Sequence, residues 1–588
     1  RRPGGRTKQQ SREAPASHSV AEWTYVPSFF ASALADEHSV SARLLVVSQF
    51  APVSDSHRSP VLGTRGMVAS SQPLATAAGL QVLQQGGNAA DAAVATAATL
   101  NVTEPNMTGI GGDCFALYYE AATGGVTALN GSGRAPARLS LERVSADGIT
   151  EVLPDHHAHA VTVPGACAGW CDLIVRHGSL SISDILEPAI DLAERGFPVA
   201  PMTARLWSIG AETQLQRSPG GRELMIDGRG PRPGEIFRNP TLAGTLQRVA
   251  EKGKEGFYQG EVAEAIVRVV GAHGGVLDER DLADHRSTWE EPISSRYRDL
   301  RVWECPPNGQ GLAALLALNI LRGFDLGDLE ALGGERLHLM IEAMRLAFAD
   351  ARWHVADPVV SSIPVAELLS EAYAAERRKG IRPDRSHPDP VRGVPFAGSD
   401  TVYLCAVDGQ GNACSFINSN YKEFGTGLVP EGFGFSLQNR GANFSLDPGH
   451  PNALAPGKRP YHTIIPGLLT RESDGSLYGP FGVMGGFMQP QGHLQVVVGM
   501  VEDGLDPQAA LDRPRFYLLD GCPGGDVLVE EDVAESTCAE LAGRGHVVRR
   551  IGGWGRVLFG RGQIIRRDPS GALWGGSDPR AAGCAMSF

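Results

Sequence analysis

The segment GSDTVYLCAVD, residues 398–408, decides how the rest of the chain is interpreted. Its apolar run from Val402 to Val407 predicts a buried strand, and residues 412–418 predict the strand that returns beside it. A loop rich in Gly, Pro and Asp precedes the run, over residues 383–400. A hydroxyl residue, Thr401, therefore stands at the start of a core strand, directly after a segment in which the chain can be cut.

Cleavage before Thr401 would create a new nucleophile. A neutral hydroxyl attacks poorly unless a base lies beside it, and an N-terminal threonine carries its own base, an α-amine with a reference pKa of about 7.7–8.0. The alternative is that Thr401 is an ordinary β-branched residue that opens a strand. Taken alone, an Asp-Thr pair favours this alternative, so the interpretation depends on motifs elsewhere in the chain.

Several glycine-rich and charged motifs accompany this segment in a set order. Together they resemble the γ-glutamyltransferase family of N-terminal-nucleophile (Ntn) hydrolases, from about Arg65 to the C-terminus. The motifs are QGGNAADAA (85–93), GIGG (109–112), FGTG (424–427), GKRP (457–460), GG (485–486) and GSDPR (576–580).

The resemblance implies a fold, a cleavage and a subunit organisation. The implied fold is of the α+β class, a four-layer αββα Ntn-hydrolase sandwich with a mostly helical segment in the large subunit. Cleavage between Asp400 and Thr401 would give a large subunit of residues 61–400 and a small subunit of residues 401–588, which stay together as an αβ heterodimer. Residues 1–60 have little periodicity and are interpreted as disordered or as an extension outside the fold.

The resemblance also assigns catalytic roles. Ser419 stands where the family has a threonine that hydrogen-bonds the nucleophile. Gly485 and Gly486 stand where the family forms its oxyanion hole. The alternatives are that Ser419 merely ends a strand and that the glycine pair is an ordinary strand-to-helix turn.

The substrate-binding positions depart from the family pattern. The family's arginine before Ala-Pro aligns with Ser132, and Arg134 follows two residues later. Its paired serines are replaced, and so are an Asn, a Gln and an Asp that hold the glutamyl α-carboxylate and α-amine. We therefore expect an amide of a small carboxylate-bearing substrate, γ-glutamyl or oxamate-like. The changes favour one without an α-amine, because a guanidinium binds a carboxylate in a bidentate manner and the acidic partner for an ammonium is gone. The replacing residues are Tyr421, Arg440, Asn443, His462 and Thr463.

The variant positions and the motif MQPQGH (488–493) resemble the oxamate-amidohydrolase and glutathione-hydrolase-like branch of the family. The segment 443–458 is also shorter than the lid of many members, which favours hydrolysis over transfer and leaves cephalosporin-acylase-like activity open. Two alternatives remain: a true γ-glutamyltransferase or glutathione hydrolase, and a non-catalytic protein that acts by binding.

Composition limits the remaining possibilities. The 588 residues carry a net charge of −13, which disfavours a nucleic-acid surface, and no apolar run of eighteen residues predicts a membrane helix. Nine scattered cysteines without framework spacing favour buried thiols in a reducing compartment, hence a cytoplasmic location. Nothing in the sequence calls for a metal ion or an organic cofactor. The histidine-rich tract at 155–159 is interpreted as a loop that leads into a strand at 160–163.

Periodicity predicts the remaining elements. Residues 180–380 are expected to be mostly helical and to cover one face of the sheets. The predicted helices cover 74–85, 89–100, 181–195, 260–270, 278–282, 312–323, 335–353 and 491–503. The predicted strands cover 68–71, 114–119, 402–407, 412–418, 434–438, 462–469 and 478–484.

Overall fold

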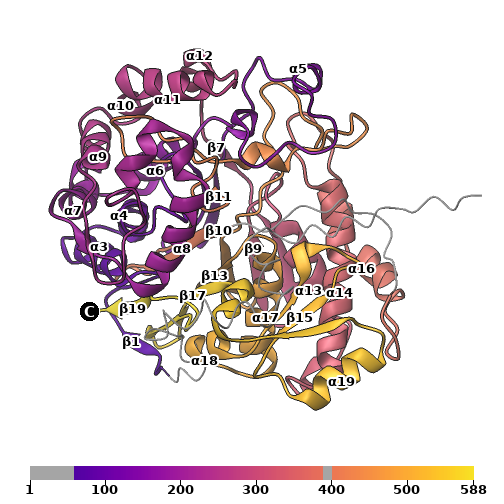
Figure 1. The fold of residues 1–588 in the computed structure, drawn as a ribbon. Coiled ribbons are helices and arrows are strands. Elements are labelled where there is room, and N and C mark those ends of the chain that lie inside the picture. Colours follow the sequence, from indigo (N-terminus) through magenta and orange to yellow (C-terminus); the bar gives the residue numbers. More distant parts are fainter. Residues whose placement is uncertain (1–57, 388–399) are drawn as a thin grey trace, which may run out of the picture. The chain divides into compact units, whose positions relative to one another are not determined.

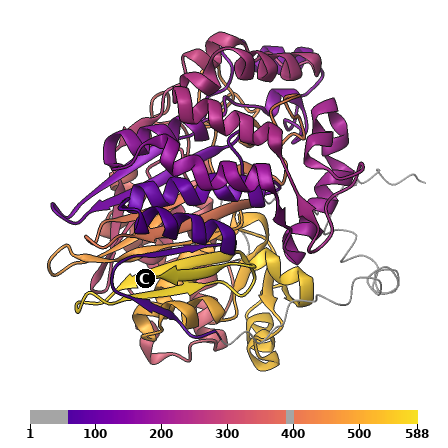
Figure 2. The same cartoon turned by 90° about the vertical axis from the view of Figure 1, so that its left-hand side faces the viewer.

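The computed structural model describes residues 58–387 and 400–588. In this part of the chain, two seven-stranded antiparallel sheets lie between two layers of helices (Figures 1 and 2). Most of the expected extension at 1–60 and most of the loop at 383–400 fall outside the described residues.

One sheet contains Thr401, and we call it the nucleophile sheet. Residues far apart in the sequence pair within it: β10 lies between β2 and β11, and β11 in turn pairs with β3. The order of its strands is β19 (Cys584–Ser587), β2 (Met67–Ser70), β10 (Asp400–Val407), β11 (Ala413–Tyr421), β3 (Asp113–Glu120), β4 (Gly125–Gly131) and β7 (Thr288–Glu290).

The second sheet packs against the nucleophile sheet. Side chains alternate between the two faces of a strand, so Thr401 and Tyr403 share a face of β10. The Tyr403 ring lies against Gly482 of β13, where a Cβ would approach within 2.5 Å of it. The order of strands in the second sheet is β1 (Val61–Gly63), β18 (Leu573–Ser577), β17 (Arg561–Arg567), β13 (Leu477–Met484), β12 (Gly467–Arg471), β9 (Leu300–Glu304) and β8 (Ile293–Tyr297).

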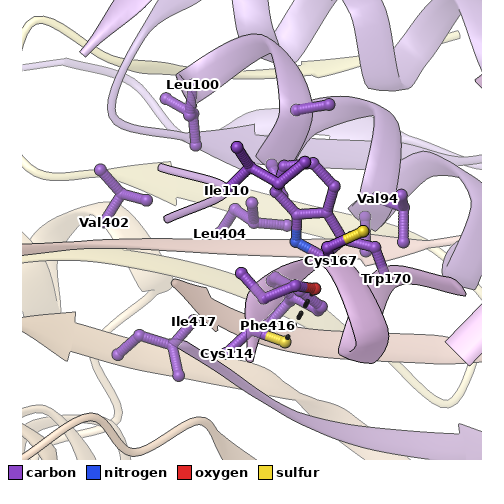
Figure 3. Close-up of a cluster of buried hydrophobic side chains, with 14 of the residues drawn as sticks. Val94, Leu100, Ile110, Cys114, Cys167, Trp170, Val402, Leu404, Phe416 and Ile417 are labelled. Atoms are coloured by element: carbon purple, nitrogen blue, oxygen red, sulfur yellow. Dashed lines mark hydrogen bonds between the residues drawn. The ribbon is translucent and has the colours of Figure 1, made fainter. Parts of the chain in front are cut away.

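Small residues let helices approach the outer face of the nucleophile sheet closely. Leu404 and Phe416 of the sheet pack there among side chains of α4 and α6 (Figure 3). Asn88 starts α4 with a capping box that includes Asp91. The helices on this side are α3 (Pro73–Gln84), α4 (Ala89–Thr103), α6 (Ala166–His177), α7 (Ile182–Arg195), α8 (Pro201–Thr213), α9 (Pro240–Lys252), α10 (Glu255–Tyr258), α11 (Glu261–Ala272) and α12 (Glu279–Ala283).

A separate apolar cluster lies on the outer side of the second sheet. It is built on two almost fully buried helices: α13 is apolar nearly all round, whereas α14 also buries charged side chains such as Arg336 and Glu342. The helices here are α13 (Gly311–Leu321), α14 (Gly334–His354), α15 (Val365–Leu368), α16 (Glu371–Arg378), α17 (Met488–Glu502), α18 (Pro507–Asp512) and α19 (Glu535–Gly543).

Short elements complete the described fold. Helix α5 (Leu141–Ala146) and the 3₁₀ turn η6 (Arg440–Asn443) lie in or beside a small third apolar cluster. Strands β5 (Phe197–Pro198) and β6 (Ile236–Phe237) pair with each other. A three-stranded sheet joins β14 (Phe516–Leu518), β15 (Val527–Glu530) and β16 (Val548–Ile551).

Most helix predictions are confirmed to within a few residues, but four expectations are wrong. Residues 160–163 and 434–438 form no strand, and the strand predicted at 462–469 begins only at Gly467, as β12. The segments without strand pairing hydrogen-bond to loops rather than to a neighbouring strand. Residues 180–380 also cover both outer faces, since α7–α12 lie on one side and α13–α16 on the other, and they contribute β7, β8 and β9 to the sheets.

Candidate active site

An irregularity in strand pairing presents Thr401. Asp400 pairs with Tyr421 and Val402 with Asn418, so β11 carries one residue more than β10 at this point. Such bulges re-aim side chains and occur beside active sites. Tyr421 has a φ of +84°, a left-handed conformation that is strained for a residue with a side chain. The local backbone is thus distorted where the predicted nucleophile lies.

Ser419 links Thr401 to Arg440 through hydrogen bonds. The Thr401 hydroxyl is fully buried and donates to Ser419 Oγ at 3.2 Å. The same oxygen accepts from the backbone N–H of Tyr421 at 2.8 Å and from Arg440 Nη2 at 3.2 Å. The structure therefore brings the predicted nucleophile, its predicted hydroxyl partner and a cation into one chain of hydrogen bonds.

Arg440 is a fully buried cation. Its Nη1 donates to Thr463 Oγ1 at 2.7 Å, and its guanidinium lies 4.2 Å from the centre of the Tyr421 ring. Burial lowers the pKa of Arg440 to about 10, so the group stays charged at neutral pH. Among the described residues, its Nε has no hydrogen-bond partner and no carboxylate lies within ion-pair distance. An arginine in this state can accept an anionic ligand.

A buried pair of Asp113 and His462 supports this cluster. His462 Nε2 lies 3.0 Å from Asp113 Oδ2, and the other oxygen accepts N–H bonds from Gly133, Gly165 and Gln438. Burial raises the pKa of Asp113 to about 6.

His462 is the neutral member of that pair. Burial and the charges of Arg440 and Arg459 lower its pKa well below the usual value. The neutral imidazole donates from Nε2, while its Nδ1 faces the Ile464 N–H at 3.4 Å. Arg440 is therefore the cation of this cluster, and His462 is a positioning group.

The side chains of Asn443 and Tyr421 are joined by a hydrogen bond. The Tyr421 hydroxyl donates to Asn443 Oδ1 at 2.5 Å, and Asn443 Nδ2 donates to the Tyr461 carbonyl at 3.1 Å. Both side chains are buried. This wall of the site is neutral, with no acidic side chain at the position where the family places one.

The glycine pair forms the turn between β13 and α17. Gly485 has a φ of +129° and Gly486 a φ of +60°, conformations that favour glycine. Among the described residues neither backbone N–H donates a hydrogen bond. Gln489, in the first turn of α17, places its Nε2 3.5 Å from Thr401 Oγ1. The turn thus lies beside the nucleophile with donors available.

The GIGG loop also lies against the site. A Cβ on Gly111 would clash with the carbonyl of Ser436, and one on Gly112 with the carbonyl of Ser419. The Asn418 amide donates to the Gly109 carbonyl at 3.0 Å. The loop needs glycine for close backbone approach.

Arg134 does not join the Thr401 cluster. Its side chain is half-buried, and no hydrogen bond or ion pair of the described residues links its guanidinium to Ser419 or Arg440. Burial lowers the pKa of Arg459 and of His285, and the charge of Arg134 adds to both shifts. Arg134 lies in a neighbouring basic region.

Other features receive structural roles. In the histidine-rich tract, His159 pairs with Asp147 at 2.7 Å, and Asp155 binds Lys422 at 2.6 Å. All nine cysteines carry free thiols, six of them buried. No helix among the described residues is long and apolar enough to cross a membrane.

Sequence reasoning missed three polar residues of the site. Asp113 begins β3 directly after the GIGG loop, a position that marks it in retrospect. Gln489 belongs to the noted MQPQGH motif. Gln310 belongs to no recognised motif, yet its Nε2 donates to the Gly486 carbonyl at 2.8 Å and to the Thr463 carbonyl at 2.6 Å.

Two antiparallel sheets between two helical layers form the αββα scaffold of the Ntn hydrolases. Comparison with known proteins specifies the family: residues 75–588 match the gamma-glutamyltranspeptidase family, and the chain belongs to it. It is an enzyme of the amidohydrolase type found in that family.

Three relatives show the breadth of the family around this chain. The glutathione hydrolase-like YwrD proenzyme of Bacillus subtilis is 37% identical, over 90% of this chain and 99% of its own. The oxamate amidohydrolase proenzyme of Klebsiella pneumoniae is 34% identical, with the same coverage of both chains. The crystal structure of cephalosporin acylase from Bacillus halodurans has a TM-score of 0.85 at 46% identity, covering 92% of this chain and 98% of that one.

Proposed function

We propose that the chain cuts itself between Asp400 and Thr401 and then works as an N-terminal-threonine amidohydrolase. In the first reaction Thr401 Oγ attacks the Asp400 carbonyl, the C–N bond breaks, and the amide nitrogen takes the hydroxyl proton. Water then hydrolyses the resulting ester, which frees a threonine with its hydroxyl and α-amine. The strand distortion at Asp400, Thr401 and Tyr421 supports this step.

The cleavage products would remain associated through the nucleophile sheet. Strands β10 and β11 belong to the small subunit, whereas their outer neighbours β2 and β3 belong to the large one. Separation would break both ladders and expose the core between the sheets. The heterodimer of residues 61–400 and 401–588 is therefore the proposed working form, and its free thiols favour a cytoplasmic, reducing setting.

In catalysis the α-amine of Thr401 would take the hydroxyl proton while Oγ attacks the substrate amide. The N–H groups of Gly485 and Gly486 would bind the oxyanion, and one such donor contributes about 3–4 kcal/mol in the transition state. Ser419 would hold the nucleophile. The leaving amine takes the proton, and water releases the acyl group.

The proposed substrate class depends on Arg440. It is a buried guanidinium, one hydroxyl group away from Thr401, with no acidic partner among the described residues. Beside it, the Tyr421–Asn443 wall offers no charge to an ammonium. The preferred acyl group is therefore a small one with a carboxylate and without an α-amine, as in oxamate or a glutaryl amide. The names of the oxamate amidohydrolase and cephalosporin acylase relatives agree with such a site.

Denaturing electrophoresis with N-terminal sequencing tests the proposal. The expressed chain should give a smaller band that begins Thr-Val-Tyr-Leu-Cys. Thr401→Ala should leave the chain uncut. Thr99→Ala is the matched control, because Thr99 is a buried threonine whose hydroxyl donates to the Ala95 carbonyl of its own helix. A wild-type chain that stays whole, or one cut elsewhere, refutes the mechanism.

A further inference from the structure

A second polar cluster lies outside the active site, on the outer side of the second sheet. His338 and Glu342 are one turn apart on α14, and His546 follows α19 in the chain, just before β16. One ligand atom from each of the three residues lies within 4.8 Å of the others, and all three side chains are buried. Among the described residues this is the one group of three such side chains that converges in this way.

The hydrogen bonds of His338 determine which of its nitrogens has a lone pair. Its Nε2 lies 2.7 Å from the Arg382 carbonyl, which can only accept, so Nε2 carries the proton. Its Nδ1 is therefore unprotonated, and it faces His546 Nε2 at 2.8 Å. A histidine held by a carbonyl on one nitrogen, with the other pointing into a cluster, is the usual arrangement of a metal ligand.

Glu342 supplies an oxygen with no hydrogen-bond partner. The backbone N–H of His387 donates to its Oε2 at 2.8 Å, which turns Oε1 toward the cluster, 4.0 Å from His546 Nε2. Oε1 is buried and has no hydrogen bond in the described part of the chain. A buried carboxylate oxygen that faces an imidazole nitrogen and accepts no hydrogen bond is a candidate ligand atom.

We propose that His338, Glu342 and His546 bind a divalent metal ion, with zinc the best match. Two imidazoles and one carboxylate suit Zn²⁺, and a tetrahedral site with bonds of about 2.0–2.2 Å separates its ligand atoms by about 3.3 Å. The two ring nitrogens would move apart by about 0.5 Å, and the carboxylate would approach by about 0.7 Å. The proton on His546 Nε2 would move to Nδ1, and water would complete the coordination.

One neighbouring charge opposes the metal. Arg345 Nε lies 3.4 Å from Glu342 Oε1, and its guanidinium also donates to the Pro523 carbonyl. Without a metal, Arg345 partly balances Glu342. With a metal, Arg345 must turn away toward the Pro523 carbonyl. The competing explanation of the cluster is thus an Arg345–Glu342 ion pair beside a His–His hydrogen bond, and it predicts no metal binding.

The position of the site gives it a structural role if the chain is cut as proposed above. His338 and Glu342 would belong to the large subunit and His546 to the small one. Arg382 and His387, which orient two of the ligands, belong to the segment of the large subunit that leads to the cleavage point. The metal would therefore join the two subunits and anchor the end of the large one.

Metal binding to the full-length protein tests the site itself. After chelator treatment and dialysis against Zn²⁺ alone, we expect one zinc ion per wild-type chain. His338→Gln and Glu342→Gln should each weaken binding at least tenfold. His354→Gln, a histidine on the same helix outside the cluster, should bind as wild type does. Zinc binding that persists in both ligand variants, or no binding by wild type, overturns the proposal.

A cobalt spectrum needs no variant, so it remains decisive if a substitution prevents folding. Co²⁺ in the wild-type protein should give the intense visible absorption of four-coordinate nitrogen and oxygen ligation, and zinc should abolish it. A weak octahedral spectrum contradicts the site.

Urea titration then tests the joining role. Zinc should raise the urea concentration that releases the small subunit from wild type but not from Glu342→Gln. An unchanged release point in wild type refutes the role. Zinc binding by an uncut chain would leave the site valid and the proposed function wrong.

Discussion

Arg440→Met is the substitution that most directly tests the proposed substrate class. It removes the buried guanidinium while keeping an unbranched side chain of similar length in a buried position. Two chromogenic anilides make the comparison: glutaryl-p-nitroanilide, which has a carboxylate, and pentanoyl-p-nitroanilide, which carries a methyl group in its place. The quantity of interest is the ratio of their kcat/KM values.

The expected magnitude follows from the contacts of Arg440. Its two Nη groups already donate to hydroxyls, at 3.2 Å to Ser419 and 2.7 Å to Thr463, and Nε has no partner. A substrate carboxylate would gain about two charge-assisted hydrogen bonds, each worth about 1.5–3 kcal/mol. Losing them lowers kcat/KM for the glutaryl substrate by about 10²–10⁴-fold. The pentanoyl substrate should change by less than about tenfold.

The assay measures initial rates on the processed fraction only, quantified by gel. The ratio of the two substrates cancels errors in active-enzyme concentration and any moderate loss of folded protein. Arg134→Met is the matched control, because Arg134 is a nearby arginine that no contact of the described residues joins to the cluster. Equal losses for both substrates in Arg440→Met would show that Arg440 supports the fold rather than the substrate, and the reasoning would be refuted.

Four further outcomes are expected. Ser419→Ala removes the oxygen that accepts from Thr401, so processing, followed by gel, should slow about tenfold; an unchanged rate would exclude Ser419 from this role. Asn443→Asp restores an acidic wall, so the preference for γ-glutamyl over glutaryl anilide should rise about tenfold, and an unchanged preference contradicts the assignment. Gly482→Ala forces a Cβ against the Tyr403 ring and should lower the free energy of unfolding by about 1–3 kcal/mol in urea titrations; unchanged stability would mean that the sheets can separate there. With an α-amine base, kcat/KM should rise with pH through about 7.7–8.0, whereas a flat profile argues for another base.

Much of the fold was predictable because its periodic elements depend on local sequence. Helices α4, α7 and α14 have caps or apolar patterns that mark them within a few residues. The failures are segments whose partners are distant. Residues 434–438 look like a strand because the apolar Phe435 and Leu437 alternate with other residues, but the segment hydrogen-bonds to loops such as the GIGG segment. Only the assembled fold determines which backbone pairs with an extended segment.

The candidate site was predictable where a motif marks it and invisible where a single polar residue acts. Thr401, Ser419 and the glycine pair were named from motif order. The structure joins Thr401 to Ser419 by a hydrogen bond and places the glycine pair in the turn before Gln489, whose side chain contacts Thr401. Asp113 and Gln310 were missed because one polar residue in a long chain has no distinguishing pattern. The neutral state of His462 was also hidden, since it arises from burial and from Arg440 and Arg459, which lie beside it only in the fold.

The protonation states of this site explain why its substrate preference should differ from that of a glutamyl-binding member. Asp113 is the acidic side chain bonded within the cluster, and its two oxygens are occupied by His462 and by three N–H donors. It therefore balances Arg440 only from a distance, and both of its oxygens already accept hydrogen bonds. A buried guanidinium without a direct counter-ion is costly, and a bound carboxylate offsets that cost. An ammonium placed beside Arg440 would be repelled instead. The discrimination thus lies as much in the absence of an acidic partner as in the presence of Arg440.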